Sequence, residues 1–213
     1  MAEWLKASVL KTGVSARVPQ VRILSPPPFR YIYNLFMDTN DYILMCMERS
    51  KDLLHEYLKD LSLEQACYQP SRISNSISWI VWHTSRGFDR RISLLDGIEQ
   101  LWMTEKWYEK YKLPASDKDL GIGHTTEDIS KIRPSNVSDL INYYESINKK
   151  MIDFFNSDKS NDLDIKITET GNSQAHELMR MVTGTFQHWG QVNYIRGIIE
   201  NRIWYTGNTK EKR

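Results

Sequence analysis

The chain has few of the residues that would place it in several common protein classes. It contains two cysteines among 213 residues, Cys46 and Cys67, and their spacing fits neither a disulfide framework nor a metal-binding motif. Basic and acidic residues number 28 and 27, so no overall charge favours nucleic acid or a membrane surface. No apolar run approaches the roughly 20 residues that span a bilayer. We expect a protein of a reducing compartment, the cytoplasm, that binds neither nucleic acid nor membrane.

The chain also lacks the short motifs of familiar catalytic centres. It shows no phosphate-binding loop, no dinucleotide fingerprint and no recognisable Ser-His-Asp arrangement. Strand patterns are weak throughout, and no internal repeat is visible. What the sequence does have is 40% hydrophobic residues and seven tryptophans, enough to bury one sizeable core. These features predict a single globular domain but assign no catalytic residue.

Residues 1–36 differ in composition from the rest of the chain. They hold five basic residues against one acidic residue, and four of the seven prolines. An organellar transit peptide or a disordered arm would explain this composition. A third interpretation rests on "AEWLKASVLKTG" and "VPQVRILSPPP", which resemble a transfer-RNA gene translated in frame. We favour the third: a non-domain extension over 1–36, a true start at Met37, a domain over 37–205 and a polar tail over 206–213.

From Met37 onward, apolar residues recur at three- and four-residue steps, the pattern of amphipathic helices. This period and the candidate cap residues predict four long helices. They run from Thr39 or Asn40 to about Leu61, from 74–76 to Gly97, from Asn136 to about Ser157, and from about Ser173 to Arg202. The sequence therefore favours an all-α bundle.

A long connection separates the second and third helices, from Gly97 to Pro134. It contains a short aromatic helical pattern and a candidate capping box of Thr125 and Asp128. A connection of this length can return the chain to the end where the second helix began. The second and third helices would then run parallel, and the second and fourth antiparallel.

Two histidines, His83 and His188, lie on the apolar seams of the second and fourth helices. Gly87 follows His83 by one turn, and Gly184 precedes His188 by one turn. Antiparallel packing places both glycines at the same level, where each removes a side chain beside an inward histidine. We predict a cavity with two imidazoles on its wall. The alternative is that each is an ordinary core histidine with a hydrogen-bond partner.

The neighbours of these histidines have two interpretations each. Gln191, one turn past His188, could orient the imidazole or pack between helices. The remaining helical histidines, His55 and His176, lie off their main seams and should be exposed. Three tryptophans would form apolar cavity walls or pack in the core: Trp79, Trp82 and Trp189.

Five segments carry a resemblance to a known family. They are "SISWIVWHTSRGFDRRI", "QLWMTEKWYEKYKLP", "GIGHTTEDISKIRP", "LINYYESINKKMIDF" and "FQHWGQVNYIRGII". With these segments in this order, the chain resembles the DinB-like (DNA-damage-inducible) superfamily of four-helix bundles. The resemblance covers essentially all of residues 37–205. The resemblance implies an up-down-down-up bundle, often a homodimer. It also implies a divalent-metal site of three histidines, and activity as a transferase or isomerase that uses mycothiol, bacillithiol or a similar thiol.

The residues of that metal site carry over only in part. The first ligand falls on His83 and the last on His188, but the middle position falls on Gly184, which has no side chain to offer. Two imidazoles are a poor site for zinc or nickel, since zinc takes three protein ligands even in open catalytic centres. His124 in the connection or Asp89 in the second helix could replace the third ligand. The simpler interpretation makes Asp89 a salt-bridge partner of Arg86, of Arg90 or of a neighbouring helix, and leaves His124 on the loop surface.

Two functional classes remain open. The first is a metal- and thiol-dependent transferase, isomerase or hydrolase that acts on a small molecule, with His83 and His188 as ligands. The second is a metal-free dimeric bundle, a small-molecule-binding or stress-associated protein without catalysis. The substrate and the thiol are not specified by the sequence.

Overall fold

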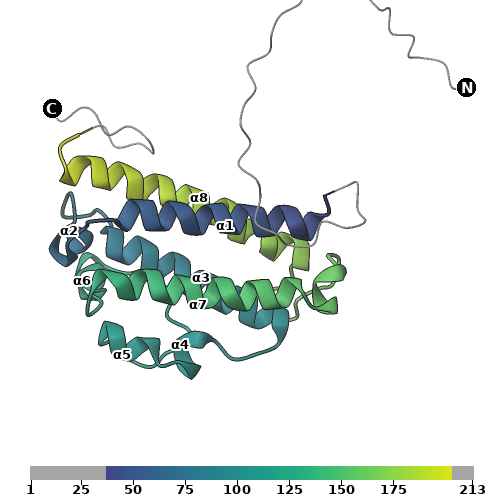
Figure 1. Ribbon diagram of the computed structural model, residues 1–213. Helices are drawn as coiled ribbons and strands as arrows, with labels where there is room; N and C mark the ends of the chain where they lie inside the picture. Colours follow the sequence, from purple (N-terminus) through teal and green to yellow (C-terminus); the bar gives the residue numbers. More distant parts are fainter. Residues whose placement is uncertain (1–36, 203–213) are drawn as a thin grey trace, which may run out of the picture. The chain divides into compact units, whose positions relative to one another are not determined.

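The computed structural model describes residues 37–202 of the chain (Figure 1). The expectations for residues 1–36, for the end of the bundle beyond 202 and for the polar tail lie outside this range. Within it, the chain is helical, with an isolated bridge between Lys166 and Ser173 and no named strand. No helix in this range is both long and apolar enough to cross a membrane. The prediction of an all-α bundle is confirmed.

Four long helices form the bundle. They are α1 (Thr39–Leu58), α3 (Ile77–Asp96), α7 (Val137–Phe155) and α8 (Gln174–Ile199). Helices α3 and α7 run in the same direction, and α1 and α8 run in the opposite direction, which agrees with the expected up-down-down-up order (Figure 1). The most extensive packing joins α3 to α8 and α7, and joins α1 to the same two helices. The α3–α8 contact is therefore antiparallel, as the placement of the two histidines requires.

Side-chain caps fix where these helices begin. Ser76, Asn136 and Ser173 each accept a backbone N–H from the first turn of α3, α7 and α8. The expected cap of the first helix was wrong. Asp38, not Thr39 or Asn40, accepts the N–H of Asp41 at 2.7 Å.

The first helix also ends earlier than expected. It stops at Leu58, because Ser62 forms a capping box with Gln65 and starts a separate short helix, α2 (Leu63–Cys67). The second long helix ends as predicted at Gly97, whose φ of 73° is the left-handed conformation that glycine adopts easily.

The crossover between α3 and α7 carries three short helices. They are α4 (Leu101–Thr104), α5 (Trp107–Tyr111) and α6 (Thr126–Lys131), the last with the predicted capping box of Thr125 and Asp128. A further one-turn helix, η1 (Asp158–Asn161), lies between α7 and α8. Tyr111 and Trp102 of the crossover are buried with Tyr143 of α7, so this connection is part of the core.

A buried ion pair on α3 attaches the crossover to the bundle. Asp89 accepts the backbone N–H groups of Leu101 and Trp102 at 2.8 and 2.7 Å. The guanidinium of Arg86 lies 3.7 Å from the Asp89 carboxylate, and both side chains are fully buried. Arg86 also donates to the carbonyl oxygens of Ser116 and Asp119 at 3.0 and 3.1 Å. Asp89 is thus a salt-bridge partner and a helix cap.

Replacing Asp89 by Asn should destabilise the protein by about 3–5 kcal/mol, because it leaves Arg86 buried without its counter-charge. Urea unfolding measures the effect. Asp96→Asn is the control on the same helix. Asp96 pairs with Lys159, whose side chain is 56% exposed, so its loss should cost less than about 1 kcal/mol. Equal losses in the two variants would show that burial of the Asp89 pair is unimportant.

Candidate functional site

The structure brings His83 of α3 and His188 of α8 together. Their ring centroids lie 5.1 Å apart, and the two ring planes are perpendicular. Both side chains are partly buried. The expectation that the two imidazoles face each other between antiparallel helices is therefore met, and the cavity with both rings on its wall stays a prediction.

The orientation of His83 is fixed by the crossover. Its Nδ1 lies 2.5 Å from the carbonyl oxygen of Leu120. A carbonyl only accepts, so Nδ1 carries the hydrogen, and Nε2 keeps a lone pair when the ring is neutral. Burial lowers the pKa of His83 below its ordinary value of 6.5, and the nearby His188 and Arg91 lower it further, although the Leu120 hydrogen bond opposes the shift. His83 is therefore neutral at pH 7, with an available lone pair.

His188 is oriented from within its own helix. Its Nδ1 lies 3.0 Å from Oε1 of Gln191, one turn further along α8. This amide oxygen accepts the Nδ1 hydrogen, so the lone pair of a neutral His188 is also on Nε2. Of the two interpretations of Gln191, the structure supports the one in which it orients the imidazole.

Tryptophans and a loop glycine form one wall of the site. Trp79 stacks on His83 with ring centroids 4.8 Å apart and ring planes within 5°. Gly121 lies against the faces of Trp79 and Trp82, where a Cβ atom would come within 2.9 Å of each ring. The backbone between Leu120 and Gly121 therefore contacts both the histidine and the tryptophans that support it.

His124 does not lie free on the loop surface, as the simpler interpretation held. It stacks on Trp82 at 5.6 Å, and its Nδ1 accepts the indole N–H of Trp79 at 3.1 Å. Its Nε2 contacts Asp119 at 3.0 Å. Both ring nitrogens are therefore engaged, and His124 supports the tryptophan wall.

The two glycines beside the histidines differ in their surroundings. A Cβ atom on Gly184 would meet nothing within 4 Å, whereas one on Gly87 would meet the guanidinium of Arg91 at 3.1 Å. Arg91 in turn pairs with Glu177 of α8 at 3.1 Å. Open space thus lies beside Gly184, and the level of Gly87 is occupied by a charged side chain.

Other candidate residues lie away from the pair. Trp189 is a core residue, because its indole N–H donates to Ser50 of α1 and its ring contacts Tyr144 of α7. His55 and His176 are exposed, as expected. Asp89 is used by the buried ion pair described above.

The donor set does not fit the three-histidine metal site that the resemblance implies. His83 and His188 offer one Nε2 each, and Gly184 stands where the third imidazole would be. Within residues 37–202, no group of three His, Cys, Asp or Glu side chains is arranged to hold a metal ion. His124 and Asp89, the two suggested replacements, have their polar atoms engaged elsewhere.

Comparisons with known proteins place the chain in a family. A family model described as mycothiol-S-transferase matches residues 43–201. The chain belongs to the mycothiol-S-transferase family. This membership confirms the resemblance to the DinB-like superfamily and identifies the relatives as thiol-dependent transferases.

The same fold occurs in a solved structure of a conserved protein from Enterococcus faecalis. It superposes with a TM-score of 0.70 at 23% identity, covering 77% of this chain and 98% of that chain. At this identity the likeness shows the fold alone. No curated protein matches the chain.

Sequence reasoning missed two features of this site. One is the Leu120 carbonyl, which carries no side-chain signal. The other is the stacking of His124 on Trp82, whose only sequence signal is the position of His124 three residues after Gly121 in "GIGH". Both depend on the path of the crossover and not on helical periodicity.

Gly121→Ala should loosen the tryptophan wall, because its Cβ atom would clash with Trp79 and Trp82. Gly123→Ala is a close control. The two glycines have φ angles of 82° and 81°, but a Cβ on Gly123 would meet nothing within 4 Å. Both variants share the left-handed strain of about 1–2 kcal/mol, so Gly121→Ala should show the larger fall in melting temperature. Equal falls in melting temperature would show that the close approach of Gly121 to the two tryptophans does not contribute to stability.

Gly184→His should complete the three-imidazole set, since its side chain enters open space one turn from His188. Zinc affinity, measured by equilibrium dialysis, should rise by orders of magnitude, and adding His188→Ala should abolish the gain. Gly190→His is the control on the same helix, where a Cβ also meets nothing within 4 Å. Gly190→His should gain the same few tenths of a kcal/mol in helix propensity, but its zinc affinity should not rise. Equal zinc binding by both variants would refute the assignment of the ligand position.

Proposed function

We propose that the chain transfers a low-molecular-weight thiol of the mycothiol class to a small electrophile, beside His83 and His188. The family's name supports the thiol and the transfer. The observation that carries the proposal is the orientation of the two rings. Each has its Nδ1 engaged by an acceptor, Leu120 or Gln191, so the lone pair of each neutral ring is on Nε2, and the two partly buried rings lie 5.1 Å apart.

His83 is the proposed base. Its Nε2 takes the proton of the thiol S–H, and the Leu120 carbonyl stabilises the imidazolium through Nδ1. The thiolate sulfur then forms a bond to the electrophilic carbon, and the leaving group departs with the electron pair of the broken bond. When the electrophile is a strained ring or a double bond, the same proton returns from His83 to the product.

His188 is the proposed partner that positions the sulfur. Its Nε2 can accept a hydrogen bond from the thiol before the proton moves, and Gln191 prevents the ring from turning. The described residues offer two imidazoles and no third metal ligand, so these steps use only groups of the chain itself: His83, His188, Gln191 and the Leu120 carbonyl. The metal-dependent form of the reaction would need a ligand that Gly184 does not supply.

A second candidate is a binding protein without catalysis. The observation in its favour is Gly184, because this family position has lost its side chain while the open space remains. In that case the chain would bind the thiol and leave the electrophile unchanged. Calorimetric binding of mycothiol or bacillithiol, without product formation, would be the outcome that selects it.

The transfer rate should depend on the protonation of His83. With mycothiol or bacillithiol and 1-chloro-2,4-dinitrobenzene, the rate should fall as the pH drops through a value below 6.5, because burial lowers the pKa of the base. The neutral ring accepts the proton, so activity is retained above this value. Absorbance of the thioether product measures the rate.

His83→Gln should reduce the rate by about 100-fold or more and remove this acid limb. His176→Gln is the control, because His176 is exposed on α8. It should leave both the rate and the limb unchanged. An acid limb that persists in His83→Gln would assign the base to another group.

A further inference from the structure

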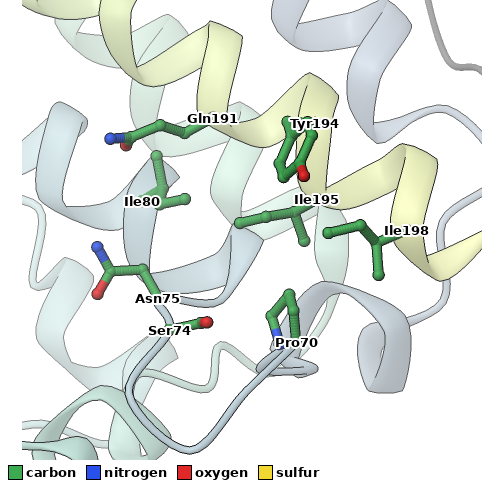
Figure 2. A pocket seen from close by; sticks show the side chains of 8 residues that line it. All are labelled: Pro70, Ser74, Asn75, Ile80, Gln191, Tyr194, Ile195 and Ile198. Carbon is green, nitrogen blue, oxygen red and sulfur yellow. The ribbon is translucent and has the colours of Figure 1, made fainter.

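A cavity of about 260 Å³ lies beside the histidine pair, between α3, α8 and the loop that precedes α3. Figure 2 shows Gln191, Tyr194, Ile195 and Ile198 along α8, with Ile80 of α3 facing them. The loop residues close the lower side of the view. The lining side chains are Pro70, Ser74, Asn75, Ile80, Gln191, Tyr194, Ile195 and Ile198.

Two of the lining residues connect this cavity to the histidines. Ile80 precedes His83 by three residues on α3, so the two lie on neighbouring turns of one face. Gln191 lines the cavity and also contacts Nδ1 of His188. A molecule in the cavity would therefore lie one helical turn from each histidine.

The cavity is apolar and carries no charge. None of its eight lining residues is ionisable except the Tyr194 hydroxyl, and four are Pro or Ile. The polar groups are amides and hydroxyls. The Gln191 Nε2 and the Asn75 amide have no hydrogen-bond partner among residues 37–202, so they can donate to a ligand. Beyond the two glycines, by contrast, Arg91 and Glu177 place charges on the same two helices.

Resting on the proposed function, we propose that this cavity binds the electrophile and selects an uncharged, largely apolar molecule about the size of a substituted benzene ring. Such a molecule would place its apolar body against Ile80, Ile195 and Ile198. An acceptor group, such as a nitro or carbonyl oxygen, would take a hydrogen bond from Gln191 or Asn75. Charged electrophiles would be disfavoured relative to neutral ones, because no lining side chain carries a charge that could pair with them.

The test measures binding directly, without turnover. The probes are 1,3-dinitrobenzene and its carboxylated counterpart 3,5-dinitrobenzoate, titrated against the full chain by calorimetry. The neutral probe should bind at least about tenfold more tightly than the anion. In nuclear magnetic resonance spectra, it should shift the side-chain amide signals of Asn75 and Gln191.

Charge-introducing variants make the test specific. Ile198 is 44% exposed and lines the cavity, so Ile198→Lys should fold and should reverse the preference toward the anion. Ile152 on α7 is 38% exposed and lies outside the cavity, so Ile152→Lys is the matched control and should leave the preference unchanged. Melting curves of both variants check their folding.

Two results would overturn the proposal: equal affinity for the two probes, or an unaltered preference in folded Ile198→Lys. Selective binding without any thiol transfer would refute the proposed function and leave the cavity assignment standing. Transfer to 1-chloro-2,4-dinitrobenzene without this selectivity would refute the cavity assignment and leave the function standing.

Discussion

The buried ion pair of Arg86 and Asp89 determines where the crossover runs, and the histidine site depends on that path. Asp89 caps α4, and Arg86 donates to the Ser116 and Asp119 carbonyls near the middle of the same connection. The next residues, Leu120 and Gly121, contact His83 and the two tryptophans. A charge pair on one face of α3 thus sets the geometry of a neutral imidazole one turn earlier on the same helix.

These two charges can be buried because almost all of their polar atoms have hydrogen-bond or ion-pair partners. A buried ion pair stabilises a fold only when further hydrogen bonds compensate the loss of water. Asp89 accepts two backbone N–H groups and the Tyr143 hydroxyl, and Lys150 lies 3.9 Å away. Arg86 stacks on Trp102 at 4.6 Å in addition to its carbonyl partners. A different loop path would leave polar atoms of the buried pair without these partners, so the pair favours the observed path.

The sequence predicts the parts of this structure that follow helical periodicity and capping. The four long helices, the Gly97 end of α3 and the inward histidines all depend on residues three or four apart, whose geometry is local. The loop contributions do not follow from such rules. The Leu120 carbonyl has no side-chain signature, and His124 reaches Trp82 only because the crossover folds back. Sequence proximity to His188 leaves Trp189 as either a cavity wall or a core residue, and only the fold, which brings its indole N–H to Ser50 on α1, decides for the core.

The pairing of two imidazoles has a consequence that does not depend on the third ligand position. Two positively charged rings with centroids 5.1 Å apart would repel in a partly buried space, and His188 is among the groups that lower the pKa of His83. A charge on His188 therefore makes protonation of His83 less favourable. With its Nδ1 engaged by Leu120 and its pKa lowered by burial, His83 holds a proton taken from a bound molecule weakly and gives it up readily. This is the property required of a base that removes one proton from a thiol and later returns it to the product.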